Sequence, residues 1–461
     1  MPDAAARLPT GGTEEGAPAP SPGQTAAPVQ AVPVDEVVRL RSPAYVRLLL
    51  LAALIGVPIS AAAYFFLQLV EALQHWVYGA LPRGLGFATT PMWWPLPVLA
   101  VAGVLVGLTI RHLPGGGGHS PVDGFAAGAE PAPIDLPGVL FAALASLSLG
   151  AVLGPEAPLI ALGAGLGVCA ARLAHQDAPK PVSAVMAAAG GFAAISALLG
   201  SPIIGAFLLM EASGLGGATL GLVLLPGLLA AGIGSLIFVG LNAMTGLGKA
   251  SLALPGLPPF DHPDIVQFGW ALVIGVCAAV LGTVIRRFAV VLRPRVEHRL
   301  LLLTPVAGLA VGGLAVAYAA TTGGEASDVL FSGESAMGPL LQNTAGYSVG
   351  ALLMLLACKA LAYSLSLASF RGGPVFPAMF LGAAGGLAMS HLPGLPLVAG
   401  VAMGIGAMCV VMLKLPLTSV LLATLLLFAD GLAVMPLVIV AVVVAHVVAA
   451  RLGPAQAVPT G

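Results

Sequence analysis

The chain has 461 residues, of which 58% are hydrophobic and only 8% are charged, and its net charge is −1. Soluble domains carry about 25% charged residues, so this composition excludes a soluble globular protein and indicates a polytopic, all-α membrane protein. The near-zero net charge gives no electrostatic basis for nucleic-acid binding. The four cysteines are single and widely spaced, so we expect no metal site and no cofactor.

Residues 1–40 are rich in Ala, Pro, Gly and Thr and lack apolar periodicity, which predicts a disordered tail rather than a signal peptide. Arg39, Arg41 and Arg47 precede the first long apolar run. By the positive-inside rule they place the N-terminus in the cytoplasm. We therefore expect a multi-pass protein of the cell (inner) membrane, surrounded by lipid.

Long apolar segments follow along the chain, and each is a candidate membrane helix. They cover residues 45–72, 92–111, 137–172, 183–212, 216–246, 267–292, 300–320, 348–369, 374–391, 395–413, 416–429 and 431–450. Several are shorter than the roughly 20 residues of a simple span, or are interrupted by Gly and Pro. The pattern predicts many tilted and broken helices, whose freed backbone groups must face protein or water.

The Gly/Pro punctuation of the chain repeats. GPEAP (154–158) and GGPVFP (372–377) each open an apolar helix rich in small residues, and their final prolines are 219 positions apart. A second pair, Pro202 and Pro416, also opens apolar helices and is 214 positions apart. Interrupted helices at matching positions in two halves point to a binding site near the middle of the membrane. We therefore predict a duplication.

The predicted halves meet near residues 286–299, where five arginines gather in what we expect to be a solvated interhelical loop. The expected organisation is a tail at 1–40, a first transmembrane half at 41–290, a second half at 291–453 and a short tail at 454–461.

Glu156 stands inside the first of these breaks, in a chain that otherwise avoids charge. An unpaired charge at membrane depth costs roughly 2.5–17 kcal/mol, which marks the residue as functional. Helix N-termini expose unpaired N–H groups and bind anions without Lys or Arg. Three Gly/Pro-marked helix starts, at 115–121, 154–158 and 372–377, are predicted to converge on one anion site. The carboxylate of Glu156 would compete with the anion for that site.

These segments resemble the CLC family of voltage-gated chloride channels and proton-coupled chloride exchangers. GGHSP (117–121) takes the place of the family's GSGIP-type motif, and GPEAP that of its G(K/R)EGP motif. ASFRGGPVFPAMFLGA matches the GSGGxFxP region, and SPIIGAFLLME the helix that leads to the inner gate. The resemblance covers about residues 40–453. It implies a CLC-type inverted repeat of the bacterial kind without regulatory domains, and a homodimer with one pore per subunit.

Carried over residue by residue, the resemblance implies that Glu156 is the external gate and, in a proton-coupled member, the outer proton acceptor. The implied anion-binding residues are Gly118, His119, Ser120, Gly154, Pro155, Ala157, Val375 and Phe376. The family's serine ligand falls on Gly118, with Ser120 two places away. Pro374 stands where the family often uses an N–H group, so one donor is missing.

Other departures from the family concern the proton. Exchangers end the helix after SPIIG with two acidic residues, whereas this chain has Glu211 followed by Ala212. Because alanine cannot carry a proton, we predict chloride transport that is channel-like or weakly coupled to protons. The alternatives left open are an H+/Cl− exchanger and a transporter of another anion such as fluoride or nitrate.

Two other classes of function are less well supported. Ser120 beside His119 suggests an intramembrane hydrolase, but adjacent residues rarely place nucleophile and base side chain to side chain. A cation transporter would need more acidic residues in its pathway than Glu156 and Glu211. The expectation is a protein that is not an enzyme.

Overall fold

The structure is a computed structural model that describes residues 41–124, 132–174, 180–213, 217–247, 258–260, 262–427 and 431–453. Residues Arg47–Gly461 form one compact unit, and the other unit, Met1–Val46, contributes only its last residues to the description. The predicted tails at 1–40 and 454–461 lie outside the described residues, so the expectation of disorder stays a prediction.

The regular elements are helices, as the sequence predicts. The first part of the chain forms α2 (Pro43–His75), η1 (Trp76–Ala80), α3 (Leu81–Gly84), α4 (Pro95–His112), η2 (Pro114–Gly117), η3 (Pro121–Asp123), η4 (Pro133–Asp135), α5 (Leu136–Ser148), α6 (Glu156–Ala174), α7 (Lys180–Leu199), α8 (Pro202–Ser213) and α9 (Gly217–Thr245). The second part forms α10 (Ile265–His298), α11 (Leu300–Thr322), η5 (Ala326–Asp328), α12 (Glu334–Gln342), η6 (Thr344–Gly346), α13 (Val349–Ser369), α14 (Val375–Ser390), α15 (Leu397–Leu413), α16 (Pro416–Leu425) and α17 (Gly431–Leu452).

Within the described part of the chain, nine helices are long and apolar enough to cross a membrane. Others, such as α8 and α16, are too short to do so alone. The apolar segments 137–172 and 183–212 each contain two helices, because Gly and Pro interrupt them near residues 150–155 and 200–202. The prediction of an all-α polytopic membrane protein with broken helices is confirmed.

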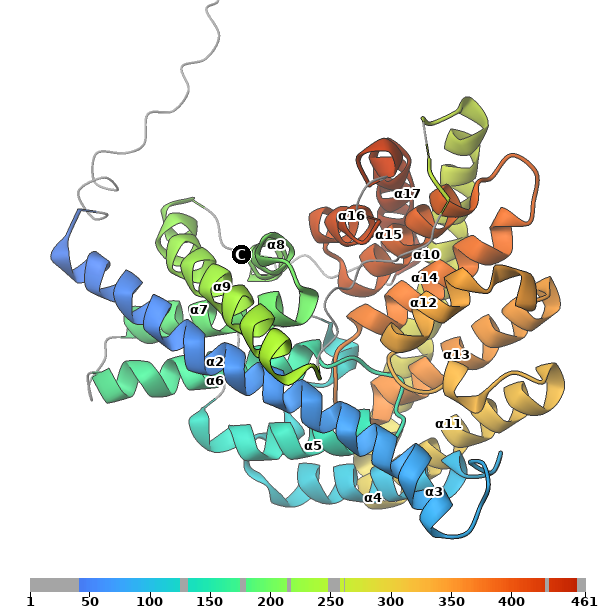
Figure 1. Ribbon diagram of the computed structural model, residues 1–461, viewed down its shortest axis with the longest axis horizontal. Coiled ribbons are helices and arrows are strands. Elements are labelled where there is room, and N and C mark those ends of the chain that lie inside the picture. The colour runs from blue at the N-terminus through green and yellow to red at the C-terminus, as the bar shows by residue number, and fades with distance from the viewer. Residues whose placement is uncertain are drawn as a thin grey trace, which may run out of the picture. The chain divides into compact units, whose positions relative to one another are not determined.

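The order of helix contacts repeats along the chain, as the Gly/Pro breaks do. Helix α6 packs on α7 and α7 on α9, just as α14 packs on α15 and α15 on α17. Figure 1 shows the first three helices on one side of the picture and the second three on the other.

The closest helix crossings repeat with the same offsets as the prolines. At the α6–α7 crossing, a side chain on Gly163 would collide with the backbone of Gly190, and at the α14–α15 crossing one on Gly382 would collide with Gly404. Gly163 and Gly382 are 219 positions apart, and Gly190 and Gly404 are 214 apart. These offsets match those of the proline pairs, which supports the duplication from packing rather than from composition.

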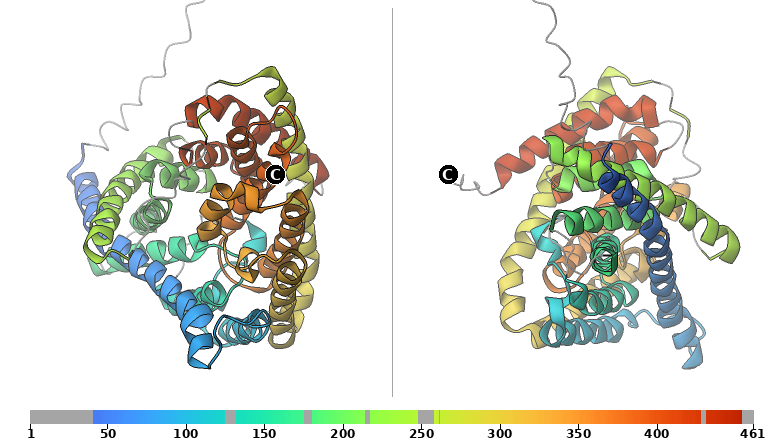
Figure 2. Two further views of the ribbon diagram at one scale, coloured as in Figure 1. Left: turned by 45° about the vertical axis from the view of Figure 1, so that its right-hand side comes forward. Right: turned by 90° about the vertical axis from the view of Figure 1, so that its left-hand side faces the viewer.

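The prediction of an interhelical loop at residues 286–299 is wrong. Helix α10 begins at a capping box formed by Asp264 and Gln267 and continues to His298, beside the helices of the second half (Figure 2). The helix tolerates its arginines because most of them donate to carbonyls or carboxylates; Arg287, for example, bonds to the carbonyl of Leu452. The division proposed at residue 290 therefore falls inside one continuous helix.

Candidate functional site

Two of the predicted helix starts are bound together by their backbones. Gly154, before α6, donates its N–H to the carbonyl of Gly373 at 2.8 Å, and Gly373, before α14, donates to the carbonyl of Gly154 at 2.6 Å. This reciprocal pair joins the two broken segments edge to edge. The N-termini of α6 and α14 consequently face the same small region.

Serine side chains brace the same corner from both halves. Ser366 in α13 accepts a hydrogen bond from the backbone N–H of Val152, just before the first break, at 3.0 Å. Ser146 in α5 accepts one from the N–H of Arg371, just before the second break, at 3.1 Å. Each half thus satisfies a backbone donor of the other half's non-helical segment, which must otherwise be buried unpaired.

Glu156 places its carboxylate in this corner. The residue is fully buried, and its Oε1 accepts a hydrogen bond from the N–H of Phe376 in the first turn of α14 at 2.8 Å. The backbone amide of Val375 also interacts with the carboxylate. The first N–H groups of a helix have no partner inside the helix, so Glu156 satisfies donors that would otherwise bind an anion.

The carboxylate fills space that only glycine leaves free. A Cβ atom at either Gly154 or Gly373 would overlap the carboxylate oxygens of Glu156. The second oxygen, Oε2, has no hydrogen-bond partner within the described residues. The carboxylate is therefore held by donors on one side only, in a tight seat formed by the two glycines.

Tyr363 closes this corner from α13. Its side chain is fully buried, and its hydroxyl donates to the carbonyl of Pro374 at 2.8 Å. The bond fixes Pro374, the residue immediately before α14, which as a proline has no N–H to donate. Sequence analysis missed Tyr363, because nothing in the surrounding apolar segment signals that it points at residue 374.

The third predicted helix start is only partly assembled. Ser120 is buried, but its hydroxyl has no hydrogen-bond partner within the described residues, and His119 is exposed. The serine and histidine therefore do not form the nucleophile–base pair of a hydrolase. Pro121, the next residue, lines a small cavity together with Pro374, so this start does reach the α14 corner.

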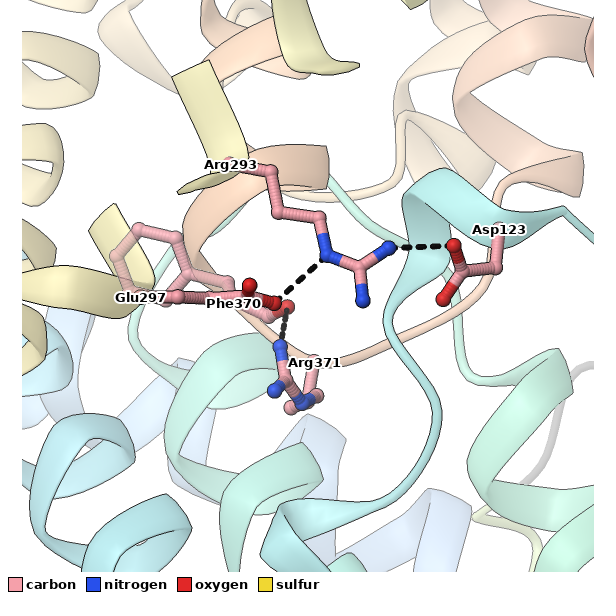
Figure 3. Close-up of polar contacts among 5 residues, drawn as sticks. All are labelled: Asp123, Arg293, Glu297, Phe370 and Arg371. Carbon is pink, nitrogen blue, oxygen red and sulfur yellow. Dashed lines mark hydrogen bonds and ion pairs between the residues drawn. The ribbon is translucent and has the colours of Figure 1, made fainter. Parts of the chain in front are cut away.

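Beside this start, a cluster of charged residues links η3 to α10, and Arg371 lies near it (Figure 3). Arg293 in α10 forms ion pairs with Asp123 in η3 and, at 2.7 Å, with Glu297 one turn further along α10. Arg371, between α13 and α14, donates to the carbonyl of Phe370 at 3.3 Å. The ion pairs tie the segment after Ser120 to α10.

Glu211 lies in a different place from Glu156. Its Oε1 accepts a hydrogen bond from the N–H of Leu417 at 3.0 Å, and its Oε2 accepts from the N–H and the hydroxyl of Thr418 at 2.8 and 2.7 Å. This carboxylate from α8 therefore caps the start of α16. Ala212, beside it, is partly buried and offers no polar group.

A large cavity of about 1230 Å³ leads to the Glu156 corner, and Leu153 and Pro155 form part of its wall. Its acidic lining residues are Glu71, Glu325, Asp328 and Glu334. Burial raises the pKa of Asp328, although a hydrogen bond from Tyr318 and the charge of Lys359 partly offset this. The cavity reaches the residues next to Glu156, whose side chain remains fully buried.

Lys359 in α13 holds part of the wall of this cavity in place. Its side chain is fully buried, and its ammonium group donates to the carbonyls of Asp328, Val329 and Leu330 at 2.8, 3.2 and 3.1 Å. It also lies 4.3 Å from the centre of the Phe380 ring in α14. All three donors of the lysine are used, so it anchors the segment after η5 to the helix that carries the Glu156 seat.

Comparison with known proteins agrees with this geometry. A family model described as voltage gated chloride channel matches residues 132–450, which is more than half of the chain. The Escherichia coli (strain 55989 / EAEC) protein YfeO, to which an ion-transport role is ascribed by name, is 30% identical over 352 residues. That match covers 75% of this chain and 79% of YfeO. The chain belongs to the voltage-gated chloride channel family.

Solved structures of this family share the fold. A slow cyanobacterial Cl−/H+ antiporter matches with a TM-score of 0.72 at 18% identity, over 88% of this chain and 95% of its own. A CLC-type fluoride/proton antiporter matches with a TM-score of 0.65 at 20% identity, over 88% of this chain and 96% of its own. The predicted CLC-type fold is confirmed.

The predicted site residues of this chloride-channel-family member fall into two groups. Glu156, Gly154, Val375 and Phe376 meet in one corner, with Pro155 and Ala157 next to Glu156 in the chain. Gly118, His119 and Ser120 belong to the other start, and among the described residues none of them hydrogen-bonds to Glu156. Gly373 was predicted only as part of the helix start at 372–377, and Ser146 and Ser366 were missed. The two serines are 220 positions apart, close to the offset of the repeat.

Proposed function

We propose that the protein transports small anions, with chloride the default, along a pathway gated by Glu156. The observation that carries the proposal is the position of the Glu156 carboxylate between Gly154 and Gly373, bonded to the N–H of Phe376. When ionised, a carboxylate is an anion tethered to the chain. The helix N-termini that hold the Glu156 carboxylate would hold a free anion in the same place once the carboxylate leaves.

The gate follows from the charge of the carboxylate. When ionised, it is attracted by the positive ends of α6 and α14 and stays in its seat. When protonated, it loses most of that attraction, and its unpaired Oε2 gives no further hold within the described residues. Swinging toward the large cavity beyond Pro155 would then clear the seat for an anion.

The contacts of Glu211 favour channel-like or weakly coupled transport. A coupled exchanger needs a second carboxyl group that takes up protons on the inner side. Ala212 cannot do so, and both oxygens of Glu211 are engaged by Leu417 and Thr418. A proton on either oxygen would cost at least one of these hydrogen bonds.

A second candidate is proton-coupled exchange. The carboxyl groups that line the large cavity favour it, because they raise the local proton concentration beside the gate. Two structural neighbours are a Cl−/H+ and a fluoride/proton antiporter, which keeps fluoride among the candidate anions. Nitrate stays a candidate from the sequence alone.

The test is flux from purified protein in liposomes, with an anion gradient and a proton gradient imposed separately. Chloride movement that never drives protons uphill supports the channel-like proposal. Proton pumping driven by chloride, fluoride or nitrate instead establishes the exchanger. Absence of any anion flux would reject both.

We further expect a homodimer with one pore per subunit in the inner membrane, with a cytoplasmic N-terminus.

A further inference from the structure

Arg286 carries an uncompensated positive charge into the helical bundle. The residue is partly buried in α10, and its Nη1 donates to the carbonyl of Val411 in α15 at 3.3 Å. The ion pairs found among the described residues both belong to Arg293, so Arg286 has no carboxylate partner there. The nearby charge of Lys414 is also positive. A partly desolvated cation without a counter-ion is costly, so a position beside it favours an anion.

A small cavity separates Arg286 from two of the predicted helix starts. Its walls include Pro121 at the start of η3, Pro374 before α14, and Met412 from α15. The volume, about 10 Å³, is close to what one water molecule needs. The unbranched side chain of Met412 can adopt several rotamers, so the space can widen for a larger particle.

The cavity lies next to the Glu156 corner. Pro374 belongs to both, because its carbonyl accepts the hydrogen bond from Tyr363 and the residue lines the cavity. Tyr363 also interacts electrostatically with both Glu156 and Arg286. Both Glu156 and Arg286 are therefore close enough to Tyr363 to act on it electrostatically.

We propose that Arg286 supplies a formal positive charge to the anion pathway, and that its cavity holds a single monovalent anion of the halide or nitrate class. Pro374 removes one N–H from the α14 helix start, and the guanidinium group of Arg286 compensates for that missing donor. The pathway then uses helix dipoles at the Glu156 seat and a true cation beyond Tyr363. This inference rests on the proposed anion transport.

The alternative is that Arg286 only fastens α10 to α15 through Val411. Two substitutions separate these roles. Arg286→Gln removes the charge but keeps an N–H donor for the Val411 carbonyl, whereas Arg286→Lys keeps the charge. Arg287→Gln is the matched control, because Arg287 is the next residue on α10, is exposed, and loses the same unit of charge.

The experiment measures initial anion flux against chloride concentration in liposomes for the wild type and the three variants. Arg286→Gln should raise the half-saturating chloride concentration by roughly tenfold or more, the effect of losing one charge-assisted contact. Arg286→Lys should stay within a fewfold of the wild type, and Arg287→Gln should not differ from it. Wild-type affinity in Arg286→Gln, or equal losses in the glutamine and lysine variants, would overturn the inference.

A second measurement does not depend on how the variants fold. Crystals of the wild-type protein grown in bromide should show anomalous scattering beside the Arg286 guanidinium. Bromide found only at the Glu156 seat would also overturn the inference, while leaving the proposed function intact. A wild-type protein that moves no anion would instead refute the proposed function itself.

Discussion

Glu156 and Glu211 present the same chemical group to the same kind of target in two very different ways. Each projects from a helix of the first half onto the start of a helix in the second half, α14 for Glu156 and α16 for Glu211. Glu156 is fully buried; its Oε1 accepts from the N–H of Phe376, and its Oε2 has no hydrogen-bond partner within the described residues. Glu211 is only partly buried and uses both oxygens in three hydrogen bonds.

The difference fits the proposed role of Glu156 as a gate and the position of Glu211 as a helix cap. A helix cap is stable when every acceptor has a donor and water remains near, as at Glu211. A group that must leave its site needs fewer hydrogen bonds to hold it there, and the unpaired Oε2 of Glu156 meets this condition. Its neighbours, Gly154 and Gly373, add a seat that fits the carboxylate and little else.

Neutralising Glu156 should have the largest effect on transport. Glu156→Gln keeps the shape of the side chain but weakens the hydrogen bond from Phe376, since bonds to charged acceptors are stronger by about 1–1.5 kcal/mol. Anion flux at neutral pH should then rise roughly tenfold, because 1.4 kcal/mol corresponds to a factor of ten. Flux through the wild type should increase as pH falls, whereas flux through the variant should be nearly independent of pH.

The matched control is Glu211→Gln, which removes the same charge from the other carboxylate. Its flux should keep the wild-type pH profile, measured in liposomes over the same pH range. An unchanged profile in Glu156→Gln, or a flattened one in Glu211→Gln, would show that the two roles have been assigned the wrong way round.

Gly373→Ala should test whether the seat of Glu156 lies on the anion pathway itself. The added methyl group would overlap Oε2, so it must either displace the carboxylate or move the backbone. In a Glu156→Ala background no carboxylate is left to displace. If anions pass through the seat, the methyl group should still reduce the flux of Glu156→Ala severalfold. A double variant as active as Glu156→Ala would place the pathway elsewhere.

Removing the cap should affect stability rather than gating. Glu211→Ala leaves the N–H groups of Leu417 and Thr418 without their acceptor, which should lower the free energy of unfolding by about 1–2 kcal/mol. The measurement is the thermal unfolding midpoint in detergent, compared with that of Glu156→Ala. We expect the larger loss of stability in Glu211→Ala. An unchanged unfolding midpoint in that variant would show that the hydrogen bonds of Glu211 to Leu417 and Thr418 contribute little.

Much of the site was predictable because its signals are local. GPEAP and GGPVFP mark helix starts through residues that break helices, and the nearly equal offsets of the two proline pairs predicted a duplication. That they bond to each other through Gly154 and Gly373 follows from the duplication only once the halves are packed. The identity of Glu156 as the carboxylate of the corner was clear from the sequence.

Other features depended on contacts between distant segments. Arg286 was assigned to a loop because five arginines close together suggest solvent, but the capping box at Asp264 starts a helix that carries them past α15. Nothing near Glu211 indicates Thr418, which lies in the other half of the chain. Tyr363 gave no signal either, since its partner is a backbone carbonyl that any residue could offer.

Thr418→Val should give the smallest change and the finest comparison of the two carboxylates. The substitution removes only the hydroxyl donor, while the N–H of residue 418 can still bind Glu211. Because Thr418 is fully buried and valine has nearly the same shape, the expected loss of stability is about 1 kcal/mol. In a Glu211→Ala background the same change should cost much less, since the hydroxyl has already lost its acceptor. Equal costs in both backgrounds, measured by thermal unfolding, would mean that the hydroxyl does not act through Glu211.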